Sequence, residues 1–203
     1  MGVTLVPAEF ILLMRRGVAN GETSVSVTTR IVLTTVAALF ATTLTSATAP
    51  APAPEFTHSR ADEWINSPPL SLASLRGKVV MVEFWAFECV NCINSRDWVH
   101  SLEQGKAAGG LVVIGVHTPE LAPEKYPDAV RKAVVRLGIQ DPVMMDQDSS
   151  YWGALHVQYW PTFCLIGRDG LLYACVPGEM HKGDPRAAKV EQALDMLLKA
   201  PAP

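Results

Sequence analysis

Residues 79–92 read VVMVEFWAFECVNC, and this stretch decides the fold. Its first nine residues form a nearly continuous apolar run after Arg76-Gly77-Lys78, which is typical of a strand covered on both faces. From Cys89 to Gln104 the sequence predicts a helix. Four residues at helical spacing form one stripe on it: Cys92, Ser95, Val99 and Leu102. The two cysteines therefore stand where a buried strand passes into a helix.

The rest of the chain alternates between strand and helix patterns. The expected elements are two short edge strands in 63–72, a buried strand at 110–118, a helix at 127–138, a strand at 142–148, a short helix at 149–157, a hairpin at 162–176 and a closing amphipathic helix at 186–200. This order predicts an α/β domain with a mixed sheet and helices on both faces.

The position of the two cysteines favours redox chemistry. Free N–H groups and the helix dipole at a helix N-terminus stabilise a thiolate, and Cys89 has this position. Cys92 lies one turn further, on the core-facing stripe. This asymmetry suits disulfide exchange, in which an exposed thiolate attacks and a buried thiol resolves the mixed disulfide. A structural crosslink and a zinc clip are the alternatives, although zinc needs four ligands.

The other two cysteines fall on the two arms of the expected hairpin. A two-residue turn at Asp169-Gly170 would place Cys164 directly opposite Cys175, on the same face and close together. Two buried free thiols are the preferred interpretation, since free cysteine is among the most buried residue types. A second disulfide between Cys164 and Cys175 is the alternative.

Several motifs together resemble a known family. They are SPPLSLASLRGKVVMVEFWAFECVNC (67–92), GLVVIGVHTPE (110–120), VRKAVVRLGI (130–139) and YWPTFCLIGRDG (159–170). Over roughly residues 64–198 they resemble the periplasmic thioredoxin-like (redoxin) domain of DipZ-type proteins, near the TlpA group. The resemblance implies a thioredoxin-like fold: a central mixed β-sheet flanked by helices, with an N-terminal β extension and an inserted strand–helix element. Separately from the resemblance, the histidines show no metal spacing and no nucleotide fingerprint appears, so neither a metal nor a cofactor is expected.

The resemblance also implies roles for particular residues. Cys89 would be the nucleophile and Cys92 the resolving cysteine of a redox-active disulfide. Glu83 stands where thioredoxins keep a buried acid, which could accept the proton of Cys92. Pro161 stands at the position of the superfamily's cis-proline, and Trp160 before it would help to form the substrate-binding surface.

Two positions depart from thioredoxin itself. Glu88 replaces the tryptophan before the first cysteine, and a carboxylate there opposes the helix dipole and should raise the pKa of Cys89. Asp97 stands where a helix proline is expected. His117, at the end of a predicted strand near the site, is a weaker catalytic candidate, and capping of the following loop is the preferred role.

These observations predict a thiol–disulfide oxidoreductase that reduces protein disulfides, in cytochrome c maturation or disulfide repair. A peroxiredoxin-like peroxidase is one alternative, but its Thr-x-x-Cys pocket would need threonine at position 86, which is Ala86. A non-catalytic binding module that presents Trp160 and Pro161 is the other. Insulin reduction separates these alternatives, because a pure binding module shows none.

The N-terminal region predicts export. Residues 31–44 are apolar or threonine and uncharged, Arg30 precedes them, and small residues follow, as in a secretory signal or a membrane anchor. The expected organisation is a signal or anchor at 1–49, a Pro/Ala-rich linker at 50–61 and the thioredoxin-like domain at 62–203. The expected location is periplasmic or extracytoplasmic, with membrane contact only through the N-terminal segment if that is uncleaved.

The expected partners are disulfide-bearing proteins and a separate membrane electron donor. The donor is expected because DipZ-type proteins carry a membrane electron-transfer domain that this sequence lacks. A net charge of −3 argues against a nucleic-acid partner.

Overall fold

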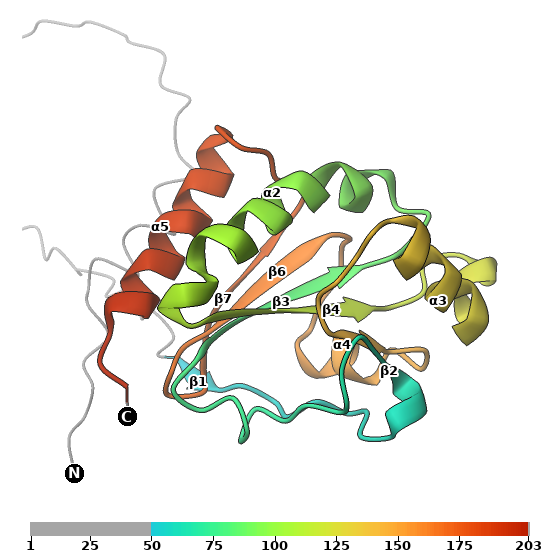
Figure 1. The fold of residues 1–203 in the computed structure, drawn as a ribbon, viewed down its shortest axis with the longest axis horizontal. Helices are drawn as coiled ribbons and strands as arrows, with labels where there is room; N and C mark the ends of the chain where they lie inside the picture. Colours follow the sequence, from blue (N-terminus) through green and yellow to red (C-terminus); the bar gives the residue numbers. More distant parts are fainter. Residues whose placement is uncertain (1–49, 203) are drawn as a thin grey trace, which may run out of the picture. The chain divides into compact units, whose positions relative to one another are not determined.

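The computed structural model describes residues 50–202, which fold around a mixed sheet (Figure 1). The strand order is β1-β7-β6-β3-β4-β5-β2. The strands are β1 (Ala51–Pro52), β2 (Trp64–Ile65), β3 (Val79–Trp85), β4 (Leu111–His117), β5 (Val143–Met145), β6 (Thr162–Ile166) and β7 (Leu171–Pro177). The α-helices are α2 (Val90–Lys106), α3 (Pro127–Arg136), α4 (Ser150–Ala154) and α5 (Pro185–Lys199). Short 3₁₀ turns are η1 (Ala61–Glu63), η2 (Ala107–Gly109) and η3 (Ala122–Lys125). The predicted thioredoxin-like α/β architecture is confirmed.

Strand β3 is the centre of the sheet, and all seven of its residues are buried. It runs parallel to β4 and antiparallel to β6. Successive side chains of a strand point to opposite faces, so Val82 and Phe84 enter one core cluster while Trp85 enters the other. Glu83 shares the face of Trp85, which is the face that α2 covers.

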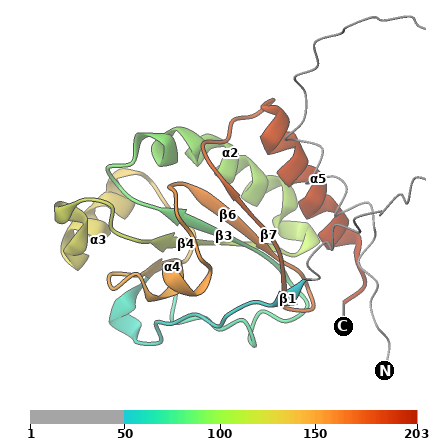
Figure 2. The ribbon, with the colours of Figure 1, turned by 180° about the vertical axis from the view of Figure 1, so that it is seen from behind.

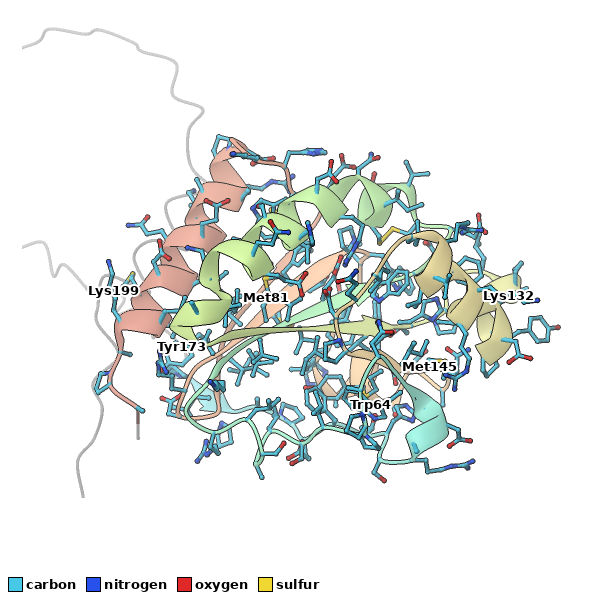
Figure 3. All side chains as sticks on the ribbon, viewed as in Figure 1. Trp64, Met81, Lys132, Met145, Tyr173 and Lys199 are labelled. Carbon is cyan, nitrogen blue, oxygen red and sulfur yellow. A yellow bond between two sulfur atoms is a disulfide. The ribbon has the colours of Figure 1, made fainter. Side chains whose placement is uncertain are left out.

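Helices cover both faces of the sheet, as Figures 1 and 2 show from opposite sides. Helices α2, α3 and α5 pack on one face, where Trp98 of α2 donates a hydrogen bond to Glu191 of α5. Helix α4 packs on the other face together with Phe56 and Leu72 of the N-terminal segment. Trp64 and Met145, labelled in Figure 3, belong to these two separate clusters. The core is thus divided by the sheet into two layers.

The N-terminal part of the domain differs from the expectation. Only Trp64–Ile65 forms a strand within 63–72, and turns follow it. Asn66 has a positive φ of 65°, which ends the strand, and the prolines after it lack the N–H groups that a ladder needs. In the expected linker, Ala51 and Pro52 pair with β7, so residues 50–61 are part of the folded domain.

The hairpin of β6 and β7 has the predicted pairing but not the predicted turn. Its loop holds three residues between Gly167 and Leu171, whose backbones bond to each other, and Gly170 takes the left-handed conformation (φ 74°). This loop alone would shift the register by one residue. A bulge between the pairs Ile166–Leu172 and Leu165–Ala174 shifts it back. Cys164 therefore lies opposite Cys175 as expected, for a different reason.

The expected signal or anchor at 1–49 lies outside the described residues. Within 50–202, no helix is long and apolar enough to cross a membrane.

Candidate active site

Cys89 lies at the junction of β3 and α2, as the sequence predicted. It is the N-cap of α2, and its Sγ accepts a hydrogen bond of 3.2 Å from the backbone N–H of Cys92. The two cysteines form a disulfide with their Cα atoms 5.2 Å apart. Cys89 is 8% exposed and Cys92 is 1% exposed. Cys89, at the helix N-terminus, is therefore the more exposed of the two cysteines.

The helix start around this disulfide favours a thiolate. The first turn of α2 carries no acidic residue, so no carboxylate in that turn offsets the positive end of the helix dipole. Val90, between the cysteines, is exposed, and so is Ile93 on the next turn. Two exposed apolar side chains therefore lie at the start of the helix that begins beside Cys89.

Glu88 and Glu124 together fix the loop before Cys89. The side chain of Glu88 is exposed, and its backbone N–H donates to Glu124 Oε1 at 2.8 Å. The other carboxylate oxygen of Glu124 accepts the N–H groups of Glu120 and Leu121. Glu124 is fully buried and lies 36 residues from its partner at Glu88. No local sequence pattern marks it, so sequence reasoning missed this anchor. The effect of the Glu88 carboxylate on the pKa of Cys89 stays a prediction.

Glu83 is fully buried on β3 and makes an ion pair that the sequence did not reveal. Arg96 of α2 donates from Nη1 to Glu83 Oε2 at 2.8 Å and from Nη2 to Asp141 Oδ2 at 3.2 Å. Oε1 of Glu83 has no hydrogen-bond partner among the described residues. Burial raises the pKa of Glu83, and the charge of Arg96 opposes this rise.

Trp160 and Pro161 come to the same side of the sheet as the cysteines. The Trp160–Pro161 peptide bond is cis. Trp160 packs against the cluster that contains Cys89 and Cys92. It stacks on Trp152 with ring centroids 4.1 Å apart, and its indole N–H donates to the carbonyl of Thr118. Trp160 therefore lies against the cluster that contains the disulfide, and Pro161 follows it through the cis bond.

Cys164 and Cys175 form a second disulfide, with Cα atoms 4.0 Å apart. The preference for two free thiols is therefore wrong. The cross-strand pairing already places the two residues opposite each other, and their side chains on one face. They belong to the core layer of Phe84 and Tyr151, on the other side of the sheet from Cys89 and Cys92. Direct exchange between the two disulfides is excluded by this separation.

His117 packs close to the site but caps nothing. Its ring stacks on Phe87 with centroids 5.5 Å apart and meets Trp85 edge-on. Neither ring nitrogen has a hydrogen-bond partner within the part of the chain that the structure describes. Burial lowers the pKa of His117 to about 4, so the ring is neutral at physiological pH. The preferred capping role is wrong, and the ring serves as part of the aromatic packing under Phe87.

His58 lies near two carboxylates whose ligand atoms are within 4.8 Å of one another, Asp146 and Asp148. The Asp146 carboxylate already accepts hydrogen bonds from Thr118 and from the backbone of Tyr151. His58 donates to the same carboxylate at 3.1 Å. This group therefore holds the N-terminal segment against the start of α4.

Known proteins resemble this chain in both sequence and fold. DipZ of Mycobacterium tuberculosis is 44% identical over 110 residues, which cover 53% of this chain and 16% of DipZ. The thiol-disulfide oxidoreductase ResA of Geobacillus kaustophilus is 27% identical over 115 residues, covering 56% of this chain and 62% of ResA. A thiol-disulfide isomerase structure from Corynebacterium glutamicum has a TM-score of 0.62 at 24% identity, covering 73% of this chain and 98% of that one.

The match to DipZ thus spans less than a fifth of that protein. The likeness to the isomerase, at its low identity, shows the fold alone. The family profile described as Redoxin matches residues 48–194, which is most of the chain. The chain belongs to the Redoxin family and forms a thioredoxin-superfamily domain of the DipZ/TlpA type.

Proposed function

We propose that this protein is an exported thiol–disulfide oxidoreductase that reduces disulfides in other proteins through Cys89 and Cys92. The observation that carries the proposal is the placement of this pair at the start of α2, with Cys89 the more exposed sulfur. ResA, which resembles this chain in sequence, is named for the same class of chemistry.

The reduced protein would act in two steps. The Cys89 thiolate attacks one sulfur of the substrate disulfide, forming a mixed disulfide and releasing the other substrate sulfur as a thiolate, which takes a proton from water. Cys92 then gives its proton to the Glu83 carboxylate and attacks Cys89 Sγ. The bond from Cys89 to the substrate breaks, the second substrate sulfur leaves as a thiolate, and Cys89–Cys92 becomes the disulfide. Two electrons pass from the protein to the substrate.

The substrate would dock over the surface beside the disulfide. Val90 and Ile93 are exposed next to Cys89, and Trp160 packs against the cysteine cluster. Backbone beside Pro161 would pair with an extended substrate chain. A disulfide-bearing protein with apolar residues near its cysteines fits this surface.

The proposed location is outside the cytoplasm. The sequence pattern of residues 31–44 supports export, and a domain with two disulfides suits an oxidising compartment. A membrane protein that supplies electrons to the Cys89–Cys92 disulfide would complete the cycle. The reducing direction follows the resemblance to DipZ-type domains and the carboxylate of Glu88.

Insulin reduction by dithiothreitol tests the proposal. The wild-type protein should accelerate it, Cys89→Ser should abolish the acceleration, and Cys92→Ser should trap mixed disulfides with substrate proteins. The Cys164→Ala/Cys175→Ala variant is the matched control and should stay active, since that pair lies in the other core layer. If the wild-type protein does not accelerate insulin reduction, the alternative of a non-catalytic binding module is favoured. Full activity of Cys92→Ser would show that the cysteine roles are wrong, and the measured reduction potential fixes the direction.

A further inference from the structure

A buried network of charges extends from Glu83 to the surface. Arg96 lies one turn beyond Cys92 on α2 and joins two carboxylates that are far apart in sequence, Glu83 and Asp141. The exposed fractions of the three side chains are 0% for Glu83, 15% for Arg96 and 3% for Asp141. Removing one partner of such a buried ion group strongly destabilises the fold. Because Arg96 and Cys92 lie on the same helix, we considered a role for this group beyond stability.

We propose that Arg96 and Asp141 are positioning residues for Glu83. Arg96 holds Oε2 of Glu83, so that Oε1 stays free to take the proton of Cys92, while Asp141 holds the guanidinium of Arg96 and offsets part of its charge. This inference rests on the proposed function, because it concerns the step in which Cys92 resolves the mixed disulfide. It assigns two residues outside the C-x-x-C motif to that step.

The geometry of Glu83 carries the first part of the argument. Among residues 50–202, Oε1 is a fully buried carboxylate oxygen with no partner, whereas Oε2 receives Arg96 Nη1 at 2.8 Å. A buried acceptor without a partner is costly, and a proton arriving from Cys92 would satisfy it. The charge of Arg96 lowers the pKa of Glu83 against the larger rise that burial causes. Without that neighbouring cation the pKa of Glu83 would rise further, and less of the ionised form would be present to accept a proton.

The second part concerns how Asp141 is held. Asn66 donates from its side chain to the carbonyl groups of Ile139 and Asp141, at 3.0 and 2.9 Å. This fixes the loop before β5, so the Asp141 carboxylate meets Arg96 in one place. The charge of Asp141 acts on Glu83 in the opposite sense to that of Arg96, since it raises the pKa of Glu83.

Two further titratable groups near this network, His100 and Glu103, lie on α2. They line a surface pocket of about 380 Å³ together with Asp141. Burial, followed by the neighbouring Asp141, raises the pKa of Glu103 to about 8. This rise weakens the competition of Glu103 for the charge of Arg96, which pairs directly with Glu83 and Asp141. The pocket gives solvent a route to the outer end of the network.

The resolution step can be measured on the protein alone. Reduced protein treated with one equivalent of Ellman's reagent releases one thionitrobenzoate when Cys89 reacts and a second when Cys92 resolves the mixed disulfide. The rate of the second release is followed against pH in a stopped-flow instrument. The pH range in which this rate falls as the solution becomes more acidic is the acid limb of the step. This readout needs no substrate protein and no electron donor.

The two positioning residues should move the acid limb in opposite directions. Arg96→Gln should shift it to higher pH by about 1–3 units, because an adjacent opposite charge lowers a carboxyl pKa by that amount. At pH values on the acid limb the rate then falls about tenfold for each pH unit by which the limb moves. Asp141→Asn should shift the limb to lower pH, because a like charge is removed while the hydrogen bond to Arg96 stays available. Arg96→Lys, which keeps the charge, should return the limb toward the wild-type position.

A matched control is Lys106→Gln on the same helix. Lys106 pairs with Asp195 of α5, so this variant removes an ion pair of α2 far from Cys92 and should leave the limb unchanged. An unmoved limb in Arg96→Gln, or shifts of the same sign in Arg96→Gln and Asp141→Asn, would overturn the inference. If the wild-type protein releases no second thionitrobenzoate, the proposed function itself fails. If the second release occurs but its pH dependence is the same in Arg96→Gln, only the role of Arg96 fails.

Discussion

Replacing both Cys164 and Cys175 by alanine should lower the free energy of unfolding by about 3 kcal/mol without slowing disulfide exchange. The two cysteines are 11 residues apart in sequence and join the strands of the β6–β7 hairpin. A crosslink restricts the unfolded chain, and the loss of entropy for a loop of this length corresponds to about 3 kcal/mol at 25 °C. For a domain of about 150 residues this lowers the melting temperature by roughly 6–12 °C.

The fold should survive this change. Strand β6 remains paired with β3, and β7 remains paired with β1. Exchange should also survive, because Cys164 belongs to the core layer of Phe84 rather than to that of Cys89 and Cys92. The variant thus separates the structural disulfide from the redox-active one.

Urea denaturation of the oxidised wild type and of the double variant measures the difference, with the insulin assay run on the same samples. Mass spectrometry of the non-reduced, alkylated wild type should find no label at Cys164 or Cys175. A loss below about 1 kcal/mol would refute the crosslink argument, since it is a third of the value expected from the loop. A large fall in exchange rate would refute the separation of the two core layers.

Three further outcomes follow from single residues. Glu83→Gln should slow resolution at neutral pH while far-ultraviolet circular dichroism stays unchanged; an unaltered rate would remove Glu83 from the mechanism. Glu124→Gln should destabilise the domain by about 1–3 kcal/mol in urea, since a partly buried backbone N–H, that of Glu88, Glu120 or Leu121, loses a charged acceptor; an unchanged midpoint would contradict this. Burial opposes protonation of His58, but the hydrogen bond to Asp146 raises its pKa above 6.5. Its ion pairs therefore stabilise the fold fully below that pH and are lost as pH rises through the folded-state pKa; His58→Gln should flatten this dependence in melting curves, and an unchanged slope would contradict it.

Local patterns in the sequence predicted the main elements of the fold. The apolar run at 79–87 and the stripe on the following helix placed Cys89 at a strand-to-helix junction, where the structure has it. The C-x-x-C pair could be placed at this junction because the motif and its family resemblance are carried by contiguous residues. Trp160 was found through its neighbour Pro161, within a recognisable motif.

The N-terminal strands and the hairpin turn were less accessible to sequence reasoning. Ala51 and Pro52 form β1 only because the edge of β7 is there to pair with them, and nothing in a Pro/Ala-rich segment indicates that partner. The predicted pairing of Cys164 with Cys175 is correct only because the one-residue shift in register from the three-residue loop is cancelled by the bulge. Register depends on both features, and neither has a strong local pattern.

The strands and helices from β3 onward and the place of the C-x-x-C pair at the start of a helix follow from the amino-acid sequence, because each depends on periodicity or on residues next to one another. Which charged side chains meet depends on the packing of the folded chain. Arg96 lies 13 residues from Glu83 and 45 from Asp141, and Glu124 lies 36 from Glu88. Such contacts form when helix and loop are packed against the sheet, and a charged side chain in a sequence looks the same whether solvent or a buried partner will surround it.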